Sequence, residues 1–191
     1  MHPKDLPIYE RSGRWLAQRK FGGTRTMVLV GRDGEPEFFN RHGGKQEKVK
    51  PSRGAVDAVR RLKLPRGKEH LLDGEMLQGD GNLLVLFDVL AFCDTYLFGK
   101  PDQQARLGIL SDCCGSGDRC DLGIMVDDGL VVAEHWTEGF EERFRESLGV
   151  PRLEGLVLRK KTSCLDSFGQ SEYETASQIR CRKPLDTHYN F

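Results

Sequence analysis

The sequence lacks any long hydrophobic run, and its most apolar segment, residues 83–92 (LLVLFDVLAF), is interrupted by an aspartate. A membrane-spanning helix needs about 18 consecutive apolar residues, so none is expected. The N-terminal segment MHPKDLPIYERSGR also lacks the apolar core of a secretory signal. These two absences predict a cytoplasmic protein with no membrane partner.

The sequence also has no excess charge of either sign, because 29 lysines and arginines balance 29 aspartates and glutamates. No bulk basicity therefore indicates a nucleic-acid partner, although a local basic surface is compatible with this balance. With 38% hydrophobic residues and 10 phenylalanines, the chain has enough apolar material for a packed core. Its 191 residues predict one domain spanning residues 1–191, and we expect a monomer.

Cysteine is too sparse and too unevenly spaced for a disulfide scaffold, since a chain of this length has only six. We expect free thiols. Cys113, Cys114 and Cys120 lie close enough in sequence to hold a metal, which leaves zinc as an alternative. The paired C-x-x-C segments of a zinc site are missing, however, and the intervening GSGDR is typical of a turn.

Short alternating hydrophobic segments separated by turn residues predict several strands and about three helices. The predicted strands are residues 15–20, 26–30, 37–41, 70–76, 83–92, 130–136, 153–160 and 177–183. The predicted helices begin after Ser52, at Pro101 and after Thr137. This pattern indicates an α+β fold with two mainly antiparallel β-sheets flanked by helices.

The segment KFGGTR, residues 20–25, places an amine and a guanidinium on a glycine-bearing turn between two predicted strands. Glycines let the backbone approach a ligand closely, which suits a phosphate. A lysine amine attacks only in its neutral form, so Lys20 would need neighbouring cations and burial as the means of activation. Arg19 and Arg25 are the nearest such cations in the sequence.

Five further polar segments follow in order: NRHG at 40–43, DGE at 73–75, FD at 87–88, EGLVLR at 154–159 and RCRK at 180–183. Together with KFGGTR, this series resembles the motifs of the covalent nucleotidyltransferase superfamily. That superfamily comprises ATP-dependent DNA ligases, RNA ligases and messenger-RNA capping enzymes. Each motif alone is weak, whereas six in the same order form a specific signal over nearly the whole chain.

Among these families the chain is similar to the small stand-alone ligases of bacteriophages, which end shortly after a C-R-K-P segment, here CRKPLDTHYNF. The resemblance implies an ATP cleft between the sheets and no additional oligonucleotide-binding domain. A phage-encoded protein of this kind would act in the host cytoplasm.

The implied activity is that of an ATP-dependent polynucleotide ligase. Lys20 would take AMP from ATP, pass it to a nucleic-acid 5′-phosphate, and the 3′-hydroxyl of a second end would displace it. We expect RNA ends as the substrate. An ATP-dependent DNA ligase, a degenerate protein that only binds ATP or nucleic-acid ends, and a capping guanylyltransferase are the alternatives.

The resemblance also implies roles for individual side chains. The nucleotide-binding set would be Gln18, Arg25, Arg41, Glu75, Phe87, Glu154, Arg180, Arg182 and Lys183. Phe87 would stack on adenine, Gln18 would accept from the adenine amine, and Glu75 would bind the ribose or orient Arg41. Mg²⁺, or Mn²⁺ in its place, would be held by Glu154, with Glu75 as the second candidate.

Two departures from the family pattern stand out. Gly22 replaces the usual Asp, His or Asn near the lysine, and Arg180 and Arg182 stand where lysines are usual. A catalytic role for His42 stays an alternative. The three histidines His70, His135 and His188 are expected to lie at the surface or to have hydrogen-bond partners inside the protein.

Overall fold

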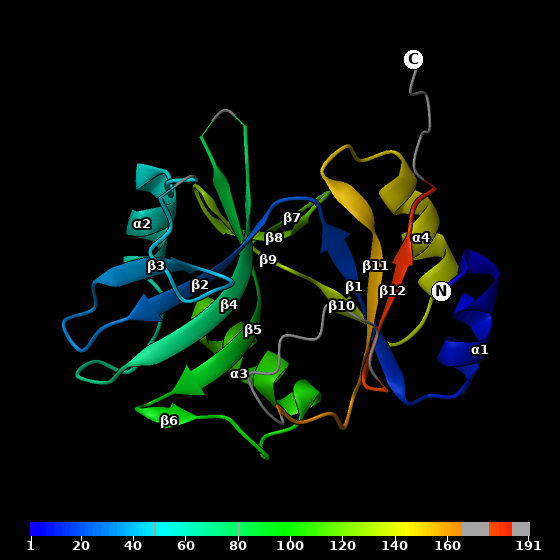
Figure 1. Cartoon of the computed structure of the whole chain (residues 1–191), viewed down its shortest axis with the longest axis horizontal. Coiled ribbons are helices and arrows are strands. Elements are labelled where there is room, and N and C mark those ends of the chain that lie inside the picture. The colour runs from blue at the N-terminus through cyan, green and yellow to red at the C-terminus, as the bar shows by residue number, and fades with distance from the viewer. Residues whose placement is uncertain (48, 80, 166–175, 185–191) are drawn as a thin grey trace.

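Two β-sheets lie side by side in the computed structural model, which describes residues 1–47, 49–79, 81–165 and 176–184 (Figure 1). The smaller sheet has the strand order β10-β1-β11-β12, and all its neighbours are antiparallel. Its strands are β10 (His135–Trp136), β1 (Trp15–Phe21), β11 (Leu153–Lys160) and β12 (Gln178–Arg182). The expected α+β class with two mainly antiparallel sheets is confirmed.

The larger sheet has the order β3-β2-β4-β5-β9-β8-β7, and β6 pairs with β5 outside this path. Among the strands that the structure describes in this sheet, only the neighbours β5 and β9 run parallel to each other. Its strands are β2 (Thr24–Val30), β3 (Pro36–Asn40), β4 (His70–Leu77), β5 (Leu83–Phe92), β6 (Thr95–Tyr96), β7 (Asp118–Cys120), β8 (Gly123–Asp127) and β9 (Leu130–Val132). Both predicted hairpins, β2–β3 and β4–β5, therefore form.

The helices divide between the two sheets. They are the 3-10 helix η1 (Pro3–Asp5) and the α-helices α1 (Leu6–Arg11), α2 (Arg53–Arg60), α3 (Gln103–Cys114) and α4 (Phe140–Leu148). Residues of α2 and α3 pack on the larger sheet, whereas residues of α1 and α4 pack on the smaller one. Ser52 caps α2 as expected, because its hydroxyl oxygen accepts from the amide of Ala55 at 3.1 Å.

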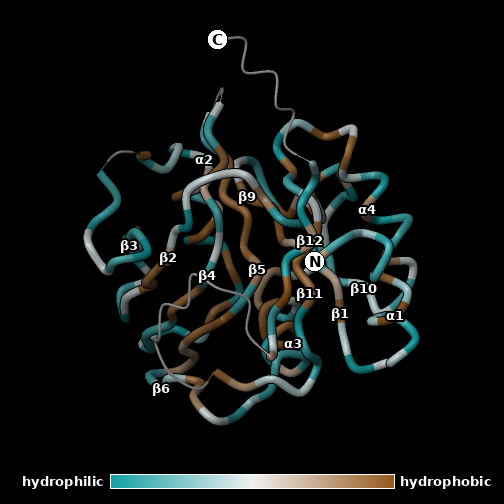
Figure 2. The backbone as a smooth tube through the Cα atoms, turned by 45° about the vertical axis from the view of Figure 1, so that its right-hand side comes forward, coloured by the Kyte–Doolittle hydropathy of each residue, from teal (hydrophilic) through white to brown (hydrophobic). Residues whose placement is uncertain are grey.

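Three hydrophobic clusters hold these layers. One lies between the larger sheet and its helices, and a second between the smaller sheet and its helices. The third joins the two sheets at one end, where Phe21 and Leu153 meet Leu77, Val85 and Val131. Figure 2 shows the hydrophobic residues concentrated in the strands and the hydrophilic ones in the connections. The sheets are thus fixed against each other next to the predicted Lys20 turn.

The predicted strand at residues 130–136 is wrong as a single element. The chain pairs with the larger sheet as β9, and after Ala133 it pairs with the smaller sheet as β10. The amide of Ala133 donates to the carbonyl of Leu86 at 2.8 Å at the crossing point. A continuous apolar pattern does not show which sheet each half joins, so sequence reasoning merged them.

Other boundaries also differ. Helix α4 begins at Phe140 after Gly139, not after Thr137, because the carboxylate of Glu10 in α1 accepts from both of these amides at 2.8 and 2.9 Å. Asp118 and Arg119, expected within the turn GSGDR, instead form strand β7 together with Cys120. Helix α1, β6 and β8 have no counterpart in the sequence-based assignment, because short elements give little periodicity.

None of the helices among the described residues combines the length and the apolar character that a membrane crossing requires. The part of the chain that the structure describes also contains no group of three or more His, Cys, Asp or Glu placed to hold a metal. Burial raises the pKa of Cys113 to about 11 and that of Cys114 to about 12. Zinc binds thiolates, so these buried thiols do not favour the zinc alternative.

Candidate active site

The face of the smaller sheet that looks away from α1 and α4 carries two of the polar residues of β1, Gln18 and Lys20, whereas Arg19 lies on the helix side and donates to Glu146 of α4 at 3.3 Å. Trp15 and Ala17 pack against α1 and α4, and since side chains alternate along a strand, Gln18 and Lys20 point to the other face. Lys20 pairs with Gly155, and Gly155 pairs with Arg182. Directly opposed residues share a face, so register brings Lys20 and Arg182 into one row.

The next row on this face comes from the same pairing. Gln18 pairs with Val157, and Val157 pairs with Arg180. Register therefore places Arg182 in the row of Lys20 and Arg180 in the row of Gln18.

The larger sheet presents a complementary set. Arg25 on β2 pairs with Glu75 on β4, and Asp73 lies two residues earlier on the same face. The guanidinium of Arg25 donates to both oxygens of Asp73, at 3.0 and 2.6 Å. Asp73 raises the pKa of Arg25 above its ordinary value through this contact. Arg25 is therefore a fixed positive charge beside Glu75.

Lys20 and Glu154 are in direct contact, since the Lys20 ammonium donates to Oε2 of Glu154. The turn that follows Lys20 links this pair to the larger sheet, because the amide of Gly23 donates to Oε1 of Glu75 at 3.1 Å. An added Cβ on Gly23 would lie 2.5 Å from the carbonyl oxygen of Met76, so glycine is required there. The turn brings Lys20, Glu154 and Glu75 together.

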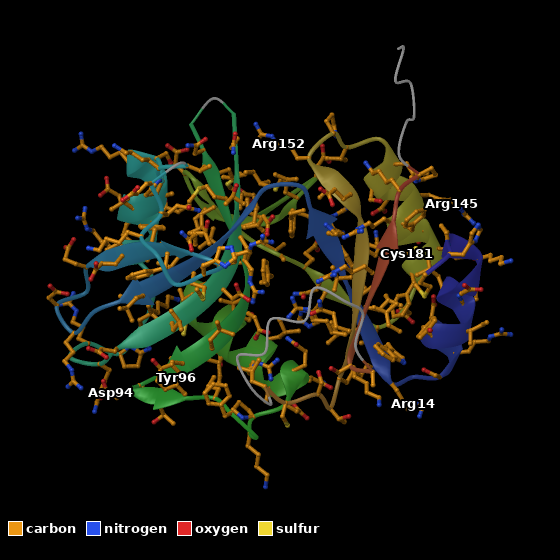
Figure 3. All side chains as sticks on the ribbon, viewed as in Figure 1. Arg14, Asp94, Tyr96, Arg145, Arg152 and Cys181 are labelled. Carbon is orange, nitrogen blue, oxygen red and sulfur yellow. The ribbon has the colours of Figure 1, made fainter. Side chains whose placement is uncertain are left out.

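Arg152 spans the same end of the two sheets. Its carbonyl accepts from the amide of Gly22 at 2.9 Å, which ties the Lys20 turn to the loop before β11. Its guanidinium reaches the β4–β5 hairpin, where a Cβ on Gly79 would come within 2.4 Å of Nη2 (Figure 3). Sequence reasoning missed this residue, because it lies in a loop outside the motifs.

Gln18 connects the sheets further along. Its Nε2 donates to the carbonyl oxygen of Phe87 at 3.3 Å, and the side chain is only 1% exposed. The other amide atom, Oε1, is buried without a hydrogen-bond partner. A buried acceptor without a donor is costly, so this atom fits a ligand that brings an N–H group, such as an exocyclic amine.

Arg159 lies next to Phe87 and was not among the predicted site residues. Its guanidinium carbon is 5.2 Å from the centre of the Phe87 ring, and its Nη1 donates to Asp88 at 3.0 Å. Asp88 is also held by Arg106, at 2.9 and 3.2 Å, and by Gln103 at 3.3 Å. The network was missed because its members come from β5, β11 and α3, although Arg159 ends the EGLVLR motif.

Two of the predicted site residues, Lys183 and Arg41, have side chains whose described hydrogen bonds go to residues other than Lys20, Glu154 and Glu75. The Lys183 amine donates to the carbonyls of Leu148 and Val150, at 3.3 and 2.9 Å, near the end of α4. Arg41 lies on the exposed loop after β3, where its Nε donates to Nε2 of His42 at 3.0 Å. Because Asn40 pairs with Thr26, register puts Arg41 at the level of Arg25.

The remaining histidines have structural surroundings. Nε2 of His70 is 3.0 Å from the carbonyl oxygen of Pro65, and the ring packs near Phe92. Burial lowers the pKa of His135, which pairs with Gln18 at the edge of the smaller sheet. His188 and the rest of residues 185–191 lie outside the described part of the chain.

Glu75 has an unusual electrostatic position. Burial raises its pKa from 4.5 to about 7, and the Gly23 amide and Lys20 only partly oppose this change. Between pH 4.5 and about 7, the folded protein therefore holds a proton that the unfolded chain has released. The contribution of Glu75 to the free energy of unfolding should accordingly decrease as the pH rises through this window.

We expect Glu75→Gln to remove this pH dependence, because an amide does not titrate. Urea unfolding of both proteins from pH 4.5 to 8 measures it, and the wild type should lose stability relative to the variant as the pH rises. A constant difference between the two proteins across the range would show that Glu75 titrates normally in the folded state.

No protein-family model and no curated protein sequence matches this chain. Solved structures match it over most of its length. Pmar-Lig is 13% identical with a TM-score of 0.65, over 94% of this chain and 45% of that one. The ligase domain of M. tuberculosis LigD is 17% identical with a TM-score of 0.61, over 87% and 54% of the two chains.

A mycobacterial DNA ligase D complexed with ATP and MES is also 17% identical, with a TM-score of 0.60 over 90% of this chain and 55% of that one. The chain thus spans about half the length of the structures that it matches. No oligonucleotide-binding barrel is present among the residues that the structure describes. These likenesses, together with the two-sheet architecture, show that the chain has the fold of a ligase nucleotidyltransferase domain.

Proposed function

We propose that this protein is an ATP-dependent polynucleotide ligase that works through a lysyl-AMP intermediate. The single observation that carries the proposal is the convergence on one face of Lys20, Glu154 and Arg182, from three strands that are far apart in sequence. The likeness to ligase domains supports the fold, and the row of side chains supports the chemistry.

The nucleotide would lie between the facing surfaces of the two sheets. The unpartnered Oε1 of Gln18 would accept from the adenine amine, and the Phe87 ring would stack on the base. Glu75 would bind the ribose from the larger sheet. Arg182 and Arg180 would contact phosphate oxygens with forked donors, in place of the usual lysines.

In the first step, Lys20 gives up its ammonium proton and the neutral Nζ attacks the α-phosphorus. A phosphorus–nitrogen bond forms as the nitrogen loses a second proton, and the bond to the β-phosphate breaks. Pyrophosphate leaves with the electron pair. An oxygen of a nucleic-acid 5′-phosphate then attacks the AMP phosphorus and releases Lys20. Finally a 3′-hydroxyl attacks that 5′-phosphate and displaces AMP, which seals the strand.

Glu154, with Glu75 as the second candidate, would hold a divalent cation, and Mg²⁺ would neutralise charge on the phosphate oxygens when bound. The carboxylate of Glu154 is 49% exposed and fits Mg²⁺, which usually keeps several waters and takes substrate phosphates as further ligands. Mn²⁺ prefers the same oxygen ligands.

The proposal is tested by sealing of nicked duplexes that carry a 5′-phosphate and a 3′-hydroxyl. Matched RNA and DNA nicks are incubated with the protein, ATP and Mg²⁺, and we expect a sealed product with faster sealing of RNA. Faster sealing of DNA would identify a DNA ligase, which is the activity named for the matched mycobacterial DNA ligase D. No sealing of either substrate would contradict the proposed function.

Gln18 tests the assignment of the adenine pocket. Gln18→Leu keeps a similar shape but removes the acceptor, so selection of ATP over GTP should fall by about 10- to 100-fold, the effect of about 1–3 kcal/mol. The specificity constants for AMP and GMP incorporation measure it. An unchanged ratio would place the base elsewhere.

Arg182 tests the phosphate contacts. It is exposed and shares a row with Lys20, so Arg182→Ala should slow sealing of a pre-adenylylated nick and reduce its salt dependence. Each lost phosphate contact should lower the log–log salt slope by roughly 0.7 to 0.9. Arg53→Ala on α2, where the side chain is 96% exposed, is the matched control. Equal slopes for the wild type and both variants would remove Arg182 from the phosphate site.

A degenerate protein that only binds ATP or nucleic-acid ends is the second candidate. The observation that favours it is Lys183, whose amine donates to backbone carbonyls near α4 rather than toward the Lys20 row. Incubation with α-phosphate-labelled ATP followed by denaturation separates the two candidates. A ligase keeps the label as covalently bound AMP, whereas a protein that only binds ATP releases it.

A further inference from the structure

Gly22 differs from the other glycines of this site. Gly23 and Gly155 are required by the backbone, because a Cβ would lie 2.5 Å from the carbonyl of Met76 or 2.1 Å from that of Cys181. Gly22 has no left-handed backbone angle, so its conformation is open to any residue. The three atoms nearest to an added Cβ all belong to the side chain of Glu154, at 3.0, 3.2 and 3.4 Å.

A β-bulge turns Glu154 toward this position. Lys20 pairs with Gly155 and the next residue, Phe21, pairs with Leu153, so Glu154 is the extra residue of β11 at the shift in register. Bulges redirect a side chain and are frequent beside active sites. Glu154 therefore leaves the regular alternation of β11, passes next to Gly22 and reaches the ammonium of Lys20.

We propose that Gly22 is a positioning residue, and that the missing side chain at this position makes the space in which Glu154 contacts Lys20. This inference rests on the proposed function only for its catalytic meaning, since the contact itself is a property of the free protein. Any side chain at position 22 would bring its Cβ to within 3.0 Å of Oε1 of Glu154, so the Glu154 side chain would have to shift.

As a consequence, the carboxylate of Glu154 would have two roles in the site. Glu154 neutralises the charge of Lys20 and is also the exposed oxygen ligand offered to a divalent cation, with 49% of its side chain accessible. A substitution at Gly22 should therefore weaken both the Lys20 contact and cation binding, without touching either partner directly.

The experiment follows the Lys20 ammonium by ¹H–¹⁵N correlation NMR at fixed pH and low temperature. Lysine ammonium signals are visible when an ion pair slows their exchange with water, and loss of the signal in Lys20→Arg assigns it. We expect the signal in the wild type and its loss in Gly22→Val and Glu154→Ala. Gly108→Ala is the control, because an added Cβ there meets nothing within 4 Å.

Mn²⁺ alone provides a second readout that does not depend on ligase activity. Added to the wild type, it should broaden the Lys20 signal selectively, whereas Gly22→Ala should need at least several-fold more Mn²⁺ for the same broadening. An unchanged Lys20 signal in Gly22→Val would overturn the proposal. Equal Mn²⁺ titrations of wild type and Gly22→Ala would overturn it as well.

If Gly22→Val fails to fold, the double variant Gly22→Val/Glu154→Ala shows whether Glu154 is the cause, because the alanine frees the space beside position 22. Folding of Gly22→Val only in the Glu154→Ala background would support the proposal, because Glu154 is then the obstacle. Unfolding in both backgrounds would overturn it, since the backbone itself would then require glycine. None of these results depends on whether AMP is transferred, so failure of the ligase assignment would be recognised separately.

Discussion

Lys20→Ala should abolish covalent AMP incorporation, lowering it by a factor on the order of 10³ or more, because the nucleophile itself is removed. Lys20→Arg should be equally inactive, since a guanidinium stays protonated at neutral pH. The fold should persist, because Lys20 forms a partly exposed pair with Glu154, and such pairs contribute about 0–1 kcal/mol. Label retained from α-phosphate-labelled ATP measures the effect.

Lys45→Ala is the control for this experiment. Lys45 is 73% exposed and pairs with Glu37 on the edge of the larger sheet, so its loss should leave incorporation unchanged. Substantial labelling of Lys20→Ala, with a melting temperature near that of the wild type, would rule out Lys20 as the AMP acceptor.

Asp88→Ala should have the largest effect on stability. Asp88 is 1% exposed and Arg106 is 2% exposed, so removing the carboxylate leaves a buried guanidinium without its counter-ion. Breaking a buried pair in this way costs about 3–5 kcal/mol in the free energy of unfolding. Arg159 also loses its contact at 3.0 Å, so nucleotide binding near Phe87 should weaken in any folded fraction.

Urea unfolding measures this loss, and Asp57→Ala provides the comparison. Asp57 pairs with Arg60 on exposed α2, and removing that surface pair should cost less than about 1 kcal/mol. A similar, small effect for both variants would show that the Asp88 network is not a structural element. Recovery of stability in Asp88→Asn, which keeps a hydrogen-bond acceptor, should be partial.

Local signals in the sequence predicted the two antiparallel hairpins of the larger sheet. Asp33-Gly34 marks the β2–β3 turn, and the turn residues QGDGN between residues 70–76 and the apolar run 83–92 predict the β4–β5 pair. Lys20 and Glu154 come together because β1 and β11 are neighbours, a pairing that the sequence analysis did not predict.

The features that were missed depend on contacts between distant elements. Glu10 caps α4 across 129 residues of sequence, so a local cap at Thr137 was the only visible choice. Asp88 meets Arg159 and Arg106 only after both sheets and α3 have assembled. The role of Gly22 likewise depends on a bulge in β11, because a shift in register leaves no mark in the residue pattern.

Covalent adenylylation of Lys20 is the step on which the proposed ligase activity depends. The direct measurement is intact-protein mass spectrometry after incubation with ATP and Mg²⁺, followed by peptide mapping of the modified residue. We predict one AMP per chain, in a phosphoramide bond to the Lys20 peptide, and its release on addition of pyrophosphate. An unmodified mass under these conditions, or AMP on a different residue, would contradict the account.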